Sequence, residues 1–402
     1  MTLSSSNDSP ALGTDAVQRL LADLVRIDSR NPELMAGAPG ERAIAEFCRD
    51  WLLRAGAEAW LDEVGPGRWN AVGRVSGGPG PTLVLCAHLD TVSSEGMTVP
   101  AFEPRIESGR LYGRGAYDMK GGVTAILAAI GALAGAPPAG TVLAALVADE
   151  EYASIGARDF ASRYPADACV VTEPSEGRLI LAHKGFVWAE VETTGVAAHG
   201  SRWDLGVSAV GRMGRIIAAL ETFDRDVLRG RVHPLVGPAS LHCATVRGGE
   251  AWSTYAPACV LQVERRTLPG ESPALVLDQL RSVIQAAGEE AEVREVLSRS
   301  PLECDPASPI ARQVRGAAQE VCGSVPEDAG VAYWMDAAVF ADAGVPTVNY
   351  GPAGEGAHAA VEWVDVGSVV NTARVLERVC LGFCAGEREP LSRGQAPVGT
   401  SR

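Results

Sequence analysis

Residues 82–92, TLVLCAHLDTV, begin as a short continuous apolar run and end with a histidine and an aspartate. The same design recurs in residues 141–151, TVLAALVADEE, and in residues 168–173, ACVVTE, where each apolar run ends at acidic side chains. Apolar strands of this length, separated by helical patterns such as that of residues 122–133, are typical of a parallel sheet buried on both faces. The sequence therefore predicts an α/β fold with a mostly parallel sheet and helices on both faces.

Side chains that could bind a cation stand at the ends of these strands or just past them. In sheets of this class ligands bind beyond the carboxyl ends of the strands, so these side chains should share one edge. Carboxylate oxygens and imidazole nitrogens suit zinc or a similar divalent ion, and a pair of such ions can activate water at neutral pH. Together with two residues from loops elsewhere in the chain, the candidates are His88, Asp118, Glu150, Glu151, Glu173 and His358.

From about residue 185 the pattern changes from continuous apolar runs to alternation. Residues 186–193 alternate apolar and polar side chains, as in an antiparallel strand with one solvated face. The order strand, helix, strand, strand, helix, strand that follows is typical of a small α+β, ferredoxin-like sandwich. We therefore expect a catalytic domain in two parts, interrupted by a lid or dimerisation domain and followed by a disordered tail. The expected ranges are 1–184 and 300–385 for the catalytic domain, 185–299 for the insert and 386–402 for the tail.

The most specific motifs are HLDTV at residues 88–92, GRGAYDMKGG at residues 113–122 and DEE at residues 149–151. Glu-Pro at residues 173–174 and a late Gly-x-x-x-His ending at His358 follow them in order. In order and spacing they resemble peptidase family M20, a superfamily of zinc-dependent exopeptidases and deacylases. Its members include acetylornithine deacetylase, succinyl-diaminopimelate desuccinylase, carboxypeptidase G2 and aminoacylase-1. The resemblance covers nearly the whole chain.

The resemblance implies two divalent metal ions, most commonly Zn²⁺ with Co²⁺ or Mn²⁺ as alternatives, and a role for each ligand. His88 and Glu173 would bind one ion. Glu151 and His358 would bind the other ion, and Asp118 would bridge both. The family also implies a cis peptide bond on the carboxyl side of Asp118. Three carboxylates and two imidazoles would nearly neutralise two such ions and still let them lower the pKa of water toward ~7.

Glu150 is implied to be the general base. It neighbours a metal ligand in sequence but points in another direction on an extended chain, because successive side chains alternate. It would therefore be free to take a proton from water and pass it to the leaving amine. Asp90 is implied to orient the imidazole of His88, since histidines that bind metals usually have such a partner.

Two residues of the insert are implied to contact the substrate. His199 matches a lid histidine that reaches the active site of a neighbouring subunit and stabilises the oxyanion, which would require a homodimer. Arg266 matches an arginine that binds a substrate carboxylate, and its neighbour Arg265 is the alternative, because only one of the two can face the pocket. The chain departs from the family at Thr254, where an asparagine is common.

The composition argues against several classes of partner and location. A formal net charge of -15 disfavours nucleic acid and anionic membranes, since both bind clusters of Lys and Arg. No apolar run reaches membrane-spanning length, and residues 1–15 lack the pattern of a secretory signal. Nine cysteines, placed mostly in apolar runs and without a Cys-x-x-Cys pair, indicate reduced thiols of a cytoplasmic protein.

We therefore expect a cytoplasmic, zinc-dependent amidohydrolase that removes the acyl group of a small N-acyl amino acid. The expected activity is like that of two members of the family, acetylornithine deacetylase and succinyl-diaminopimelate desuccinylase. The same centre would also serve a carboxypeptidase or a di- or tripeptidase with a short peptide as substrate. A metal-binding module without catalysis is the third hypothesis, although no base or ligand is missing from the motifs.

Overall fold

The computed structural model describes residues 10–386, which divide into two compact units. Within that range the first unit contains the residues up to Leu181, the segment Cys304–Asp328 and the residues from Met335 onward. The second unit contains Ala182–Glu303 and the short segment Ala329–Trp334. Apart from Gly386, the expected disordered tail lies outside the described residues.

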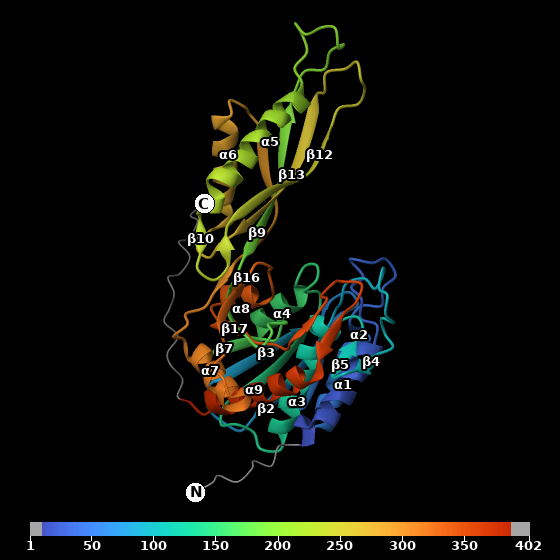
Figure 1. Ribbon diagram of the computed structural model, residues 1–402, viewed down its shortest axis with the longest axis vertical. Coiled ribbons are helices and arrows are strands. Elements are labelled where there is room, and N and C mark those ends of the chain that lie inside the picture. The colour runs from blue at the N-terminus through green and yellow to red at the C-terminus, as the bar shows by residue number, and fades with distance from the viewer. Residues whose placement is uncertain (1–9, 387–402) are drawn as a thin grey trace. The chain divides into compact units, whose positions relative to one another are not determined.

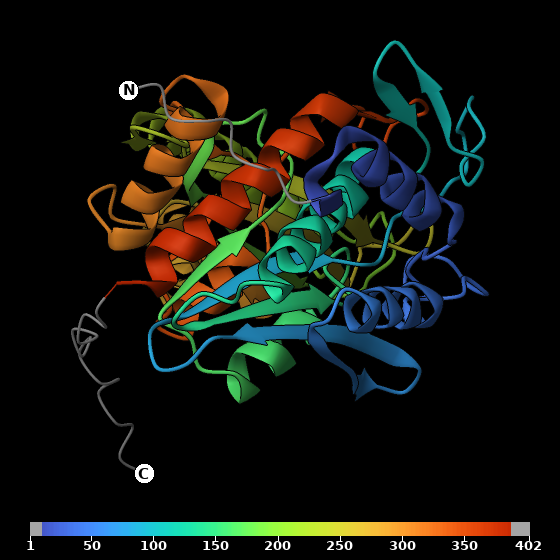
Figure 2. The same cartoon turned by 90° about the horizontal axis from the view of Figure 1, so that it is seen from below.

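The first unit contains a mixed sheet with the strand order β1-β2-β6-β3-β7-β17-β8 (Figures 1 and 2). Strands β6, β3, β7 and β17 are parallel neighbours, whereas β1, β2 and β8 pair antiparallel on either side of them. The expected fold class is confirmed, and its parallel part carries the candidate ligands. The strands are β1 (Glu58–Gly65), β2 (Arg68–Ser76), β3 (Thr82–His88), β6 (Thr141–Val147), β7 (Ala168–Val171), β8 (Leu179–His183) and β17 (Thr347–Asn349).

Helices cover both faces of this sheet, which explains why its central strands are apolar without alternation. Strands β3, β6 and β7 are buried almost from end to end. One face is covered by α3 together with α1, α2, α7 and α9, and the other by α4 and α8 (Figure 2). Their bounds are α1 (Thr14–Arg26), α2 (Arg42–Arg54), α3 (Gly121–Ala134), α4 (Ile155–Arg163), α7 (Pro309–Cys322), α8 (Ala337–Asp342) and α9 (Val366–Cys384), with a short turn η1 (Pro10–Leu12) before α1.

A second, four-stranded antiparallel sheet of the first unit was not expected from the sequence. Its order is β18-β19-β5-β4, so it joins strands from two distant parts of the chain. The strands are β4 (Arg105–Glu107), β5 (Arg110–Tyr112), β18 (Gly354–Glu355) and β19 (Trp363–Asp365). The loop that carries His358 lies between β18 and β19, and the turn η2 (Ala116–Lys120) follows β5. This sheet therefore brings the segments of His358 and Asp118 together.

The second unit has the expected order of strands and helices. Its antiparallel sheet runs β12-β13-β9-β14, and α5 and α6 pack against it. The alternation predicted for β9 is observed, with Val187, Ala189 and Val191 in the core. Ser208 and Ser272 cap the two helices by accepting backbone N–H groups, as serine commonly does. The bounds are β9 (Gly185–Thr194), α5 (Ala209–Asp226), β12 (Ser240–Gly248), β13 (Ala258–Thr267), α6 (Pro273–Ala286) and β14 (Glu292–Arg299).

Five short elements complete the description, namely η3 (Leu228–Gly230), β10 (Val232–His233), β11 (Gly237–Pro238), β15 (Leu302–Glu303) and β16 (Asp328–Val331). All nine cysteines are free thiols, in agreement with the sequence analysis. Between residues 10 and 386, no helix has both the length and the apolar character needed to cross a bilayer.

Candidate metal centre

His88 ends strand β3 with a buried ring whose two nitrogens have different partners. Nδ1 lies 2.9 Å from the backbone carbonyl oxygen of Asp90, whereas the carboxylate of Asp90 is 3.6 Å away. Nε2 lies 3.1 Å from Oδ1 of Asp118 and 3.5 Å from Oε1 of Glu173. An Nδ1–H that donates to the carbonyl turns Nε2 toward two carboxylates, and this nitrogen can bind a metal once it has lost its own proton.

Asp118 lies between the two histidines. Its Oδ1 faces Nε2 of His88 at 3.1 Å, and its Oδ2 faces Nε2 of His358 at 3.2 Å. The same nitrogen of His358 is 3.1 Å from Oε2 of Glu151. The peptide bond between Asp118 and Met119 is cis, as the resemblance implies. The carboxylate of Asp118 is therefore shared by two groups of potential ligands.

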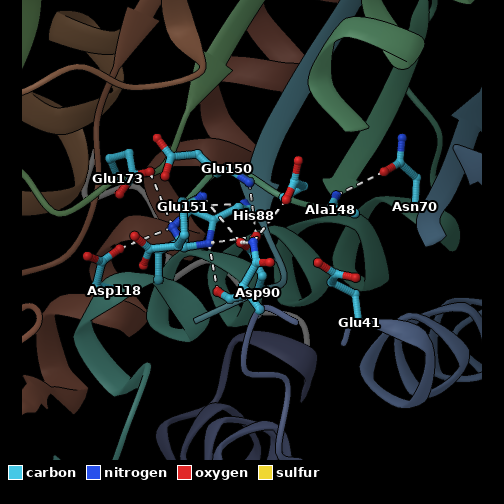
Figure 3. Close-up of polar contacts among 12 residues, drawn as sticks. Glu41, Asn70, His88, Asp90, Asp118, Ala148, Glu150, Glu151 and Glu173 are labelled. Carbon is cyan, nitrogen blue, oxygen red and sulfur yellow. Dashed lines mark hydrogen bonds and ion pairs between the residues drawn. The ribbon is translucent and has the colours of Figure 1, made fainter. Parts of the chain in front are cut away.

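The donor atoms converge closely enough to hold cations. Candidate atoms of His88, Glu150 and Glu173 lie within 4.8 Å of one another, and so do those of His88, Asp118 and Glu151. Figure 3 shows these side chains pointing toward one another, His88, Glu150, Glu151 and Glu173 from the loops or ends of neighbouring strands and Asp118 from the turn η2. Nitrogen and oxygen donors in this ratio fit zinc and similar divalent ions. All six candidates of the first unit come together, namely His88, Asp118, Glu150, Glu151, Glu173 and His358.

Burial and mutual charge perturb the pKa of each acid in this cluster. Burial raises the pKa of Glu150 well above its usual range, and the neighbouring Glu173 carboxylate adds to the effect. Glu173 is raised well above its range too, first by burial, while the His88 imidazolium opposes the shift. Burial also acts to raise the pKa of Asp118, but hydrogen bonds from His358 and His88 outweigh it and the net shift is downward. Hydrogen bonds to Asp118 and Glu151 raise the pKa of His358 to about 10.

The pKa shifts of these side chains have a common electrostatic cause, which is the burial of an excess of negative charge in the cluster. Carboxylates crowded in a buried space favour whatever positive charge is available, either protons or metal cations. Two divalent ions would supply that charge at the same donor atoms. The donor set therefore fits the pair of ions expected from the sequence.

Asp90 does more than the sequence analysis expected. Its buried carboxylate accepts the backbone N–H groups of Glu150 at 3.1 Å and Glu151 at 3.2 Å. The side-chain amide of Asn31 donates to Asp90 at 2.8 Å and to Asp149 at 3.0 Å. Asp90 thus holds the backbone of the two glutamates, while its own carbonyl oxygen orients His88. Nothing in a single sequence indicates that Asn31 would donate hydrogen bonds to these two carboxylates.

A buried ion-pair network continues away from the centre. Arg68 donates from Nη2 to Asp149 at 2.9 Å and from Nε to Glu41 at 2.8 Å. Asn70 accepts the backbone N–H of Ala148 at 2.9 Å, a contact drawn in Figure 3. The sequence analysis missed Glu41, Arg68 and Asn70. The only local signal for such a network was the acidic triplet of residues 149–151. A third carboxylate that is buried beside two others needs a cationic partner, and Arg68 is that partner.

His199 and Arg266 lie in the second unit. His199 is exposed, its Nδ1 lies 2.9 Å from Oγ of Ser201, and its backbone pairs with that of Thr254. Arg266 donates to Glu264 at 2.7 Å and lies over the ring of Phe186.

Arg265 occupies the opposite side of the same strand. Its side chain is buried and donates to both oxygens of Glu271, at 2.7 and 2.9 Å. Because Arg265 is committed to the interior of its unit, Arg266 remains the better candidate for a substrate carboxylate. Strand alternation left both arginines open as candidates, and the burial of Arg265 now favours Arg266.

Known proteins resemble this chain along most of its length. Residues 84–382 match the model of peptidase family M20/M25/M40. An acetylornithine deacetylase of Myxococcus xanthus is 30% identical over 388 residues, which cover 92% of this chain and 98% of that protein. An acetylornithine deacetylase of Vibrio campbellii is 28% identical over 363 residues, which cover 86% of this chain and 92% of that protein.

Solved structures share the fold at lower identity. Aminopeptidase PepT from Bacillus cereus has a TM-score of 0.77 at 20% identity, covering 93% of this chain and 99% of that one. An M20 family metallo-carboxypeptidase from Sulfolobus solfataricus has a TM-score of 0.74 at 17% identity, covering 91% and 99%. The family expected from the motifs is confirmed: the chain belongs to peptidase family M20/M25/M40 and is a metallohydrolase that acts on amide or peptide bonds.

Proposed function

We propose that this protein is a dinuclear amidohydrolase that removes the acyl group of an N-acyl amino acid. The observation that carries the proposal is the position of Asp118, whose two oxygens face two separate histidines at 3.1 and 3.2 Å. A carboxylate so placed is suited to bridge a pair of ions. The deacylase reaction is favoured because relatives matched over nearly their full length are named acetylornithine deacetylase.

In this proposal His88 and Glu173 would hold one ion, Glu151 and His358 would hold the other, and Asp118 would be shared. The ions are most commonly Zn²⁺, with Co²⁺ or Mn²⁺ as alternatives that the same donors accept. When bound, such a pair polarises the substrate carbonyl and lowers the pKa of water to about 7. Asp90 keeps the imidazole of His88 and the backbone of both glutamates in place.

Glu150 acts as the general base and acid. Its carboxylate takes a proton from the attacking water at one Oε atom and gives it to the nitrogen of the leaving amine. Glu150 lies beside His88 and Glu173, so its carboxylate is placed to exchange a proton with a water at this edge of the sheet.

Two residues of the second unit complete the proposed machinery. Arg266 binds the carboxylate of the amino-acid product through its planar guanidinium. His199 stabilises the oxyanion in the active site of a partner subunit, so the working form is a homodimer.

The proposed dimer is formed through the second unit. Trp203 and Trp252, in the loops that also carry His199 and Thr254, are almost fully exposed. Large exposed aromatic side chains of this kind are enriched where a protein surface is covered by a partner. We further propose a cytoplasmic location, which the mostly buried free thiols support.

A metallo-exopeptidase is the second candidate. The solved structures of this fold include proteins named aminopeptidase and carboxypeptidase. The two activities need the same centre, because both hydrolyse an amide bond with an activated water. They differ in the group on the other side of the bond, an acyl chain in one case and an amino acid in the other.

The test is a hydrolysis panel with the purified protein. N-acetyl and N-succinyl amino acids, N-acetylornithine among them, are compared with di- and tripeptides before and after removal of metal ions by a chelator. We expect the N-acyl amino acids to give the highest kcat/KM, with activity lost to the chelator and restored by Zn²⁺. A higher kcat/KM for peptides would favour the exopeptidase. Full activity without divalent ions would rule out both.

A further inference from the structure

Glu362 is a buried acid that the mechanism above does not use. It lies four residues after His358 and is completely inaccessible to solvent. Its carboxylate accepts three backbone N–H groups, from Gly115 at 2.9 Å, Tyr117 at 3.0 Å and Asp118 at 3.0 Å. One side chain therefore fixes the backbone of the entire turn that presents Asp118.

Arg114 completes this arrangement from the same turn. Its Nη1 donates to Oε2 of Glu362 at 2.7 Å, and its Nη2 donates to the carbonyl oxygen of Ala359 at 3.2 Å. The backbone N–H of Gly113 also donates to the carbonyl oxygen of Glu362, at 3.2 Å. These contacts join residues 113–118 to Ala359 and Glu362, and so connect the two loops that supply Asp118 and His358. We call them the loop clamp.

The loop clamp is more than the neutralisation of one buried charge. Arg114 alone would suffice to pair Glu362, yet the carboxylate also accepts three of the four backbone N–H groups between residues 115 and 118. Gly115 in that turn has a φ of 76°, and a Cβ there would meet a methyl group of Thr91 at 2.6 Å. The backbone at Gly115 therefore packs closely against Thr91, and the hydrogen bonds to Glu362 set the direction of the residues that follow it.

We propose that Glu362 is a positioning residue that sets the direction of Asp118 and ties it to His358. The inference rests on the proposed function, because it assumes that Asp118 and His358 are metal ligands. Side chains that hold the direct metal ligands in place commonly contribute about 10–100-fold to metal affinity. Loss of the loop clamp should therefore lower the affinity for the ion beside His358 more than the affinity for the other ion. The other ion keeps His88 and Glu173, which come from different strands.

The experiment compares Glu362→Gln with the wild-type protein and with Glu355→Gln. Glu355 is an exposed acid seven residues earlier and serves as the matched control. The amide of Glu362→Gln accepts with one oxygen only and turns an N–H toward a backbone donor or Arg114. Zn²⁺ affinity is measured by competition with a chelator, and the rise in melting temperature on adding Zn²⁺ is measured for each protein.

We expect Glu362→Gln to bind one Zn²⁺ about 10–100-fold more weakly, to show a smaller rise in melting temperature and to have a lower kcat at unchanged KM. Glu355→Gln should match the wild type. A purely structural role would lower the melting temperature equally with and without Zn²⁺, and that result would overturn the inference. If Glu362→Gln does not fold, Glu362→Asp takes its place, since it keeps the charge but is too short to reach all three donors.

The outcomes separate this inference from the proposed function. A wild-type protein that binds no divalent ion would refute the dinuclear centre itself. A wild-type protein that binds two ions, together with a Glu362→Gln variant of equal affinity, would refute only the positioning role of Glu362.

Discussion

In the proposed mechanism, replacement of Glu150 should separate catalysis from metal binding. Its neighbour Glu151 contacts His358, whereas Glu150 lies with His88 and Glu173. We expect Glu150→Ala to retain both ions, because the proposed ligands are other residues, and to lose kcat by about 10²–10⁴-fold, the usual contribution of a general base. Steady-state kinetics, together with metal content by mass spectrometry, measure the two effects.

The control for this variant is Glu107→Ala, at an exposed position of β4. It should leave kcat and metal content as in the wild type. Glu150→Ala with wild-type kcat would remove Glu150 from the mechanism. Loss of an ion in that variant would instead make Glu150 a ligand.

The register of the strands decides which loops meet at the centre. In the parallel pair β3 and β6, His88 stands opposite Val147, so the loops after both strands emerge at one edge. Asp90 then accepts the backbone N–H groups of Glu150 and Glu151. The parallel pairing of β3 and β6 thus places the HLDTV and DEE motifs side by side, in two loops joined by hydrogen bonds.

Asn31 links these loops from a third segment, and its removal should loosen them. Asn31→Ala takes one donor from Asp90 and one from Asp149, both of which are buried. We expect the free energy of unfolding to fall by about 1–3 kcal/mol for each carboxylate left without that donor. We also expect kcat to fall about 10-fold or more, since the backbone of Glu150 moves with Asp90.

Denaturant unfolding and steady-state kinetics check these values. Asn371→Ala, at an exposed position of α9, is the matched control and should change neither. An Asn31→Ala protein with reduced stability but unchanged kcat would show that the linkage serves the fold alone.

The assembly of two chains has its own test. If His199 acts in the active site of the partner subunit, a mixed dimer of Glu150→Ala and His199→Ala contains one centre with both residues intact. Random exchange of subunits should then restore about one quarter of wild-type activity, because half of the dimers are mixed and each has one complete centre. The two variants are inactive or nearly so when assayed separately.

Activity after mixing, measured with analytical ultracentrifugation, checks this expectation. The control mixes His199→Ala with a chain that carries both changes, which cannot supply the missing histidine. A dimer that exchanges subunits without regaining activity would show that His199 acts within its own chain or not at all. A monomer of full activity would refute the dimer.

The sequence by itself determined the fold class and the family, and it predicted the side chains that the structure brings together. Apolar runs ending at His88, Glu150 and Glu173 specify buried parallel strands, whose carboxyl ends must share an edge. The glycine-rich stretch before α3 and the late histidine were recognisable from the motifs. These features are local or periodic, so they can be read without coordinates.

Only the tertiary structure decided how the centre is held. The antiparallel sheet β18-β19-β5-β4 brings the loops of Asp118 and His358 together, and its strands are too short for a periodic signal. The contacts of Glu362 and Asn31 join residues far apart in the chain. Asp90 orients His88 through its carbonyl oxygen and keeps its carboxylate for two backbone donors. Such choices depend on contacts of 2.8 to 3.2 Å between distant segments, which no pattern along one chain encodes.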